Sequence, residues 1–182
     1  EKELNELGSL RAKADAIRTR LAKSINTKYQ ENPAYYENFS KRIKEALELY
    51  KARTITEAEY LAKMRDILED YRTGKSAIAY PDRIRANVHA QAFYGVLTAI
   101  FSNEKLSVEP DFAAEMALDI TTIIEKHSQV DWTHNLTIHD RISQDIDDLF
   151  YRYQKEKGLV LSFDVIDMII ENVKTVALRR FA

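Results

Sequence analysis

Residues 55–74 read ITEAEYLAKMRDILEDYRTG, and they predict a helix with both of its ends marked. Thr56 and Glu59 have the spacing of a capping box, in which each side chain accepts a hydrogen bond from the other residue's backbone N–H. Gly74 readily adopts the left-handed conformation that ends many helices. Between the two ends, apolar residues recur every three or four positions, at Tyr60, Leu61, Met64, Leu68 and Tyr71. This spacing predicts an amphipathic helix with one buried face.

The same helical spacing continues on both sides of this segment, with breaks at proline, glycine and cap residues. It predicts further helices over residues 4–29, 33–50, 88–102, 110–127 and 137–158, and a last one that begins at Ser162. Residues 75–87 are interpreted as a connection or a short helical turn, and residues 128–136 as an irregular stretch. Only Leu159-Val160-Leu161 could form a strand, and three residues do not make a sheet. The sequence therefore predicts an all-α fold, an irregular bundle of about six or seven helices.

We expect residues 1–182 to form a single helical domain, with possible sub-lobes at 1–74 and 82–182. The chain does not begin with Met, which suggests a fragment of a longer subunit. The helix over 88–102 is the least polar, so it is expected near the centre. The first helix should bury a seam of Leu7, Leu10, Ala14, Ile17 and Leu21. The last helix should bury Phe163, Ile166, Ile169, Ile170, Val173 and Ala177.

Composition excludes several classes of protein. The 182 residues contain no cysteine, which removes thiol nucleophiles, iron–sulfur clusters and cysteine-bound zinc. The formal net charge is −2, so the chain as a whole attracts neither nucleic acid nor an anionic membrane. No apolar run approaches the ~18 residues that a membrane span needs. We therefore expect a cytoplasmic protein without membrane contact.

Two partial motifs do not add up to a catalytic or cofactor site. Gly74-Lys75-Ser76 resembles the end of a phosphate-binding loop, but position 69, where that loop needs a glycine, is a glutamate. Pro81-Asp82 and Pro110-Asp111 resemble the start of a metal-dependent nuclease signature, but no acidic-x-Lys triplet follows closely. We therefore assign no catalytic, cofactor or metal residue.

Histidines near residue 134 leave one alternative open. His134 and His139 lie close in sequence to Asp131 and Asp140, and all four side chains can bind a metal. Their spacing of five residues differs from the i, i+4 pair that a helical zinc site prefers. A stand-alone, metal-dependent helical enzyme is therefore the rival interpretation, and a structural role is favoured.

A basic segment raises a third possibility. Between Arg11 and Lys28 there are six basic residues and only one acid, Asp15. On a helix these residues point in many directions, whereas a helix that contacts phosphates usually concentrates its charges. The candidate DNA-contact residues are Arg11, Arg18, Arg20 and Lys23.

Four segments in order resemble the C-terminal domain of the R (restriction, motor) subunits of type I restriction-modification enzymes. They are Glu31-Asn32-Pro33-Ala34-Tyr35-Tyr36, Thr54-Ile55-Thr56-Glu57-Ala58-Glu59-Tyr60-Leu61, His89-Ala90-Gln91-Ala92-Phe93-Tyr94-Gly95-Val96-Leu97, and Val130-Asp131-Trp132-Thr133 followed by Arg141. The family commonly ends in a basic helix and a Tyr-Gly-x-Pro turn. Here the helix carries Asp145, Asp147 and Asp148, and Lys157-Gly158-Leu159 replaces the turn.

The resemblance implies that this chain is the docking and scaffold part of an ATP-dependent endonuclease and is catalytically silent by itself. The parent subunit of this family combines a nuclease, two ATPase lobes and a helical domain that helps dock the motor onto the methyltransferase core. The implied partners are the methyltransferase (M) and specificity (S) subunits, the rest of the R subunit, and DNA through the parent complex. ATP and Mg²⁺ would act in the parent, with no cofactor in this part.

Aromatic residues are the expected partner anchors, because buried aromatics dominate the energetics of many interfaces. Ten tyrosines are too many for the core of a chain this long. Tyr35 and Tyr151 are the favoured contact residues, since each is adjacent to a residue that fits the buried stripe better. Trp132, the only tryptophan, is the third candidate.

Overall fold

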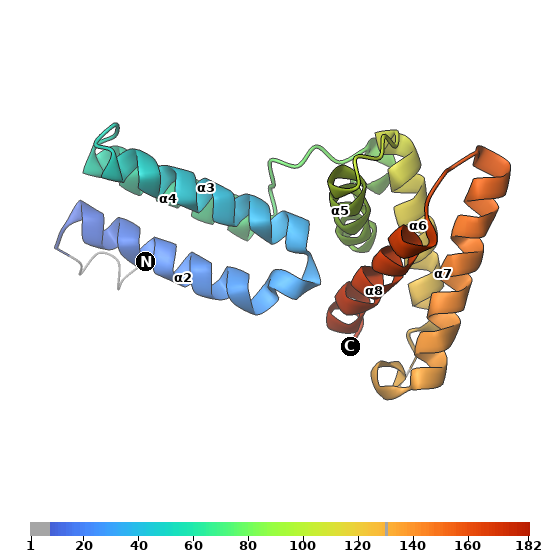
Figure 1. Ribbon diagram of the computed structural model, residues 1–182. Helices are drawn as coiled ribbons and strands as arrows, with labels where there is room; N and C mark the ends of the chain where they lie inside the picture. Colours follow the sequence, from blue (N-terminus) through green and yellow to red (C-terminus); the bar gives the residue numbers. More distant parts are fainter. Residues whose placement is uncertain (1–7, 130) are drawn as a thin grey trace. The chain divides into compact units, whose positions relative to one another are not determined.

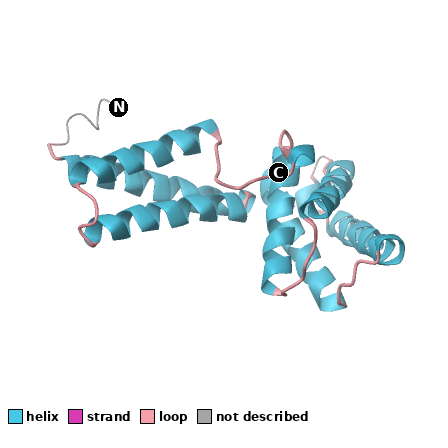
Figure 2. Cartoon of the chain, turned by 90° about the horizontal axis from the view of Figure 1, so that it is seen from above, coloured by secondary structure: helices cyan, strands magenta, loops and turns pink. Residues whose placement is uncertain are grey.

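The computed structural model describes residues 8–129 and 131–182 (Figure 1). These residues form seven α-helices, α2 (Leu10–Lys28), α3 (Pro33–Lys51), α4 (Glu57–Thr73), α5 (Val88–Asn103), α6 (Pro110–His127), α7 (Leu136–Lys157) and α8 (Phe163–Arg180). Three short 3₁₀ turns join them, η1 (Tyr29–Glu31), η2 (Asp82–Ile84) and η3 (Trp132–His134). Figure 2 shows only helices and loops over the described residues, and the all-α fold is confirmed. The expected helix start at Leu4, the seam residue Leu7, and Val130 lie outside the described residues.

Side chains at the helix ends explain where the helices begin and stop. The capping box at α4 is confirmed: Thr56 Oγ1 accepts from the Glu59 N–H at 3.2 Å, and the Thr56 N–H donates to Glu59 Oε2 at 2.7 Å. Gly74 ends that helix with φ +74°. The expected start of α7 at Thr137 lies one residue after the observed start at Leu136. Asn135 is the N-cap, because its side chain accepts from the Ile138 N–H.

The chain divides into two compact units. Unit 1 comprises Glu1–Tyr29 and Tyr35–Ala79, and unit 2 comprises Gln30–Ala34 and Tyr80–Ala182. This division falls near the two possible sub-lobes, except that residues 30–34, which include the first two residues of α3, belong to unit 2.

Unit 1 buries aromatic rings between three helices. α2 and α4 pack closely along the seam of Ala14, Ile17, Leu21 and Ile25. The rings of Tyr50 and Tyr60 stack at 4.8 Å, joining α3 to α4. The expected burial of Leu10 is wrong: its side chain is 44% exposed because it lies at the first position of α2.

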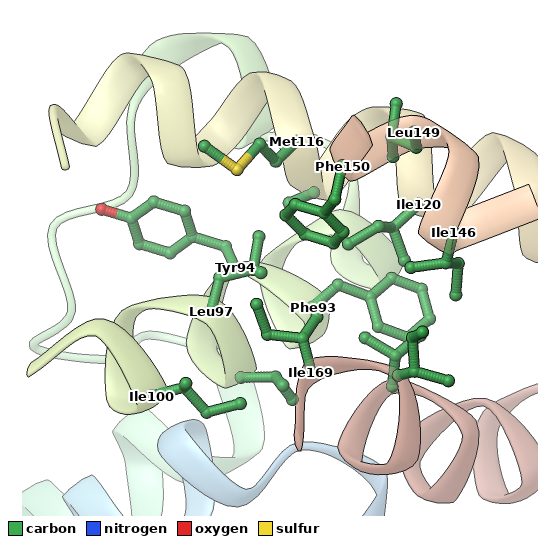
Figure 3. Packing of buried hydrophobic residues seen from close by; sticks show 14 of the residues in the cluster. Phe93, Tyr94, Leu97, Ile100, Met116, Ile120, Ile146, Leu149, Phe150 and Ile169 are labelled. Carbon is green, nitrogen blue, oxygen red and sulfur yellow. The ribbon is translucent and has the colours of Figure 1, made fainter. Parts of the chain in front are cut away.

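Unit 2 is built around α5, as its low polarity predicted. Nine of its residues are buried, and the helix packs against both α6 and α8. In Figure 3 Phe93 and Leu97 project among Met116, Phe150 and Ile169, which come from three other helices. The expected burial of Phe163 is wrong. Phe163 is the first residue of α8 and is 83% exposed, because the described structure brings no other side chain over it.

The segment 30–34 is held onto unit 2 by close contacts. A Cβ atom placed on Gly95 would lie 2.7 Å from the Ala34 Cβ, so only glycine lets the segment approach α5 this closely. The Arg180 guanidinium donates to the backbone oxygens of Glu31 and Val88, each at 3.0 Å. Two of the segments that carry the family resemblance, 31–36 and 89–97, therefore meet at Gly95.

Candidate interaction surface

Unit 2 exposes large apolar side chains near the junction of α7 and α8. Val160 and Phe163 are each 83% exposed, and Tyr151 on α7 is 65% exposed. A partner that covered these side chains would gain about 25 cal/mol for each Å² of apolar surface removed from water. Tyr151 is therefore accessible to a partner, and its role as a contact residue stays a prediction. The exposure of Val160 and Phe163 was not predicted from the sequence. For Phe163 a signal was present, because a residue directly after the cap Ser162 lies in the first turn of the helix.

Tyr151 has charged neighbours of both signs on the same helix. Asp147 and Asp148 are exposed one turn before it, and Arg152 and Lys155 are exposed after it. A partner surface that carries both charges would complement this region.

Trp132 is removed from the contact residues by its burial. Its side chain is only 3% exposed, and its Nε1–H donates to the backbone oxygen of Phe181 at 3.0 Å. The indole therefore joins η3 to the end of α8 inside unit 2. The irregular stretch that contains it gave no sequence signal for this burial.

Tyr35 occupies an intermediate position. It is half-buried against the core of unit 1, with its ring 5.1 Å from that of Tyr36 and 5.0 Å from that of Phe39. Its ring therefore supports the packing of α3, and only part of it could contact a partner.

The histidines of the rival interpretation make other contacts. His139 Nε2 lies 3.1 Å from the backbone oxygen of Trp132, and His134 Nδ1 lies 3.0 Å from the Thr133 hydroxyl. Within residues 8–129 and 131–182, no three His, Asp or Glu side chains are grouped so that they could hold a metal ion. The structure thus provides no observation that favours a metal-dependent enzyme.

A groove of about 470 Å³ lies between α6 and α7, and ion pairs occupy its walls. Asp145 accepts from Lys126 and lies equally close to His127 Nε2, both at 2.8 Å. These hydrogen bonds, the one from Lys126 first, hold the pKa of Asp145 below its ordinary value. Tyr153 donates to Asp119 at 2.6 Å, and burial together with this bond raises its pKa. The charges that line the groove are therefore largely engaged with each other.

On α2, Asp15 forms ion pairs with two of the four candidate DNA-contact residues. Its carboxylate lies 3.7 Å from Arg11 Nε and 3.4 Å from Arg18 Nε. Arg20 and Lys23 are exposed on other sides of the helix. The structure thus separates the pair Arg11 and Arg18, which contact Asp15, from the pair Arg20 and Lys23, which lie on other sides of the helix.

Taken together, the fold and these surfaces define an all-helical module that presents aromatic and charged side chains to solvent. None of its described helices is long and apolar enough to cross a membrane. A family model described as "Type I restriction enzyme HindI endonuclease subunit-like, C-terminal" matches residues 1–177. The chain belongs to this family, and the resemblance inferred from its sequence is confirmed. A search of curated proteins finds no match, and a search of solved structures finds none either.

Proposed function

We propose that this chain is a docking and scaffold domain that attaches the motor part of a type I restriction enzyme R subunit to the methyltransferase core. The observation that carries the proposal is the family match over residues 1–177, which describes the C-terminal part of an endonuclease subunit. The exposed side chains of Tyr151 and Phe163 in unit 2 support it. Interfaces of this kind draw most of their affinity from a few aromatic anchors surrounded by a polar rim.

In this proposal the chemistry belongs to other parts of the assembly. The R subunit as a whole would use ATP and Mg²⁺ to move along DNA and cleave it, in the cytoplasm. This domain would contribute binding energy and rigidity. Its partners would be the M and S subunits together with the rest of the R subunit.

A binding assay tests the docking role. The chain is mixed with the purified methyltransferase core at tens of micromolar and analysed by size-exclusion chromatography. We expect the two to co-elute. The variants Tyr151→Ala and Phe163→Ala should each weaken the complex by about tenfold or more, the usual effect of losing an aromatic anchor.

Tyr29→Ala is the matched control, since Tyr29 is also an exposed tyrosine (40%) but lies in unit 1. It should leave the complex unchanged. Failure to co-elute, or equal weakening by all three variants, would contradict docking through unit 2.

A further inference from the structure

The small net charge of the chain conceals a large asymmetry between its two units. Unit 1 carries 16 Lys and Arg against 12 Asp and Glu. Unit 2 carries 11 Lys and Arg against 17 Asp and Glu. Unit 1 therefore has a formal net charge of +4 and unit 2 of −6. Such an asymmetry between parts of one chain suggests contact with nucleic acid or with a membrane through the basic part.

Within unit 1, α2 concentrates this positive charge. It holds six basic residues, and its only carboxylate is Asp15. Asp15 is turned toward Arg11 and Arg18, and it accepts a hydrogen bond from the Tyr60 hydroxyl at 3.4 Å. On this side of α2 the single carboxylate is thus shared by two arginines, which leaves a net charge of +1.

The other side of α2 carries a basic stripe, which we define as Lys13, Arg20 and Lys23. At 100° per residue these three positions fall within an arc of about 80°, about 15 Å long. Ala16 and Thr27 lie on the same arc, so small or neutral side chains separate the cations. Lys23 and Arg20 are exposed, and Lys13 is half-buried.

From this arrangement we propose that unit 1 binds the phosphate backbone of duplex DNA through the basic stripe of α2. Lys13 and Lys23 are the residues on which the proposal rests. The stripe differs from the candidate set inferred from sequence, because Arg11 and Arg18 are engaged by Asp15. The proposal is independent of the docking role, which concerns unit 2.

The surroundings of the stripe favour nucleic acid over a membrane or a protein. The large apolar side chain that α2 exposes is Leu10, at its first residue, whereas an interfacial membrane helix needs a continuous apolar face. The stripe also contains no aromatic anchor of the kind that protein interfaces use. Apart from Leu10, three residues before Lys13, the described helix α2 exposes no large apolar side chain, and such surroundings suit phosphates, whose recognition is mainly electrostatic.

Salt-dependent binding tests the proposal. The whole chain is titrated against a duplex of about 20 base pairs at several salt concentrations between about 50 and 200 mM. Two or three phosphate contacts predict a slope of about −2 to −3 in a plot of log K against log salt. The double variant Lys13→Gln/Lys23→Gln should reduce the magnitude of this slope by about 2. Each phosphate contact raises the binding constant about eightfold at 0.1 M salt relative to 1 M salt. The loss of two contacts should therefore lower the affinity at 0.1 M salt about sixtyfold.

The double variant Lys41→Gln/Lys51→Gln is the matched control. It makes the same charge change on exposed residues of the same unit, with the same spacing of ten residues, but on α3. A much smaller loss for this control supports the stripe, and an equal loss overturns it. A slope near zero for the unmodified chain also overturns it, as does tighter binding of phosphatidylserine vesicles than of the duplex. Co-elution with the methyltransferase core should be unaffected by Lys13→Gln/Lys23→Gln, which separates this test from that of docking.

Discussion

Replacing Gly95 by alanine should destabilise unit 2, although alanine is the better helix former. In an exposed helix interior, Gly→Ala stabilises by about 1 kcal/mol. Here the added methyl would lie 2.7 Å from the Ala34 Cβ, well inside van der Waals contact. Segment 30–34 cannot easily move away from the added methyl group, because two hydrogen bonds hold it in place. Arg180 donates to the Glu31 carbonyl, and Arg179 donates to the Gln30 side chain at 2.8 Å. Overpacking of this kind costs about 1–3 kcal/mol, so we expect a net loss of about 1 kcal/mol.

Urea unfolding followed by fluorescence measures this change. Trp132 is the only tryptophan and is buried in unit 2, so its emission reports this unit. The double variant Ala34→Gly/Gly95→Ala is the control, because removing the Ala34 methyl makes room for the new one. In a double-mutant cycle the two changes should show a favourable coupling of about 1 kcal/mol or more. Stabilisation by Gly95→Ala alone would refute the close approach of segment 30–34 to α5.

Three further predictions concern helix ends and pH. Thr56→Ala should destabilise unit 1 by about 1 kcal/mol, because it removes the capping box of α4, and the urea midpoint of unit 1 should fall. An unchanged urea midpoint would count against the cap. Lys105→Gly should stabilise unit 2 by about 0.5–1 kcal/mol, because Lys105 has φ +55°, and a lower melting temperature would disprove this. Burial and the neighbouring Arg180 lower the pKa of His89 below its ordinary value of about 6.5. As the pH falls, His89 is therefore protonated in the unfolded chain before it is protonated in the folded chain. Unit 2 should lose stability as the pH falls through the ordinary pKa of histidine. His89→Asn should flatten this dependence between about pH 7 and 5, and an unchanged profile would contradict it.

Local signals made most of the helices predictable. The capping box at Thr56, the glycine at 74 and the spacing of apolar residues act over a few residues, so they can be read along the chain. The low polarity of α5 likewise placed it at the centre of unit 2, where its residues are buried.

The errors lie where tertiary contacts decide the outcome. Leu10 and Phe163 fit the apolar spacing of their helices, but each is the first residue of its helix, and the described structure leaves it exposed. Trp132 looked like a surface anchor, and its burial depends on the end of α8, 49 residues away. The pairing of Asp15 with Arg11 and Arg18 also required side-chain positions. The spacing of about 100° between helical positions already separates the stripe from Arg11 and Arg18, and the structure adds the ion pairs that engage these two arginines.

The assignment of segment 30–34 to unit 2 affects how this chain can be dissected. The chain passes from unit 1 into unit 2 at residue 30, returns at 35, and passes into unit 2 again at 80. A protease cut near residue 80 would thus yield a C-terminal fragment without the peptide that packs on Gly95. Deletion mapping that assumes one boundary at residue 80 would leave unit 1 complete but unit 2 without residues 30–34, and a binding defect caused by this loss could be assigned to unit 1. Supplying residues 30–34 as a separate peptide would show whether such a fragment can be repaired.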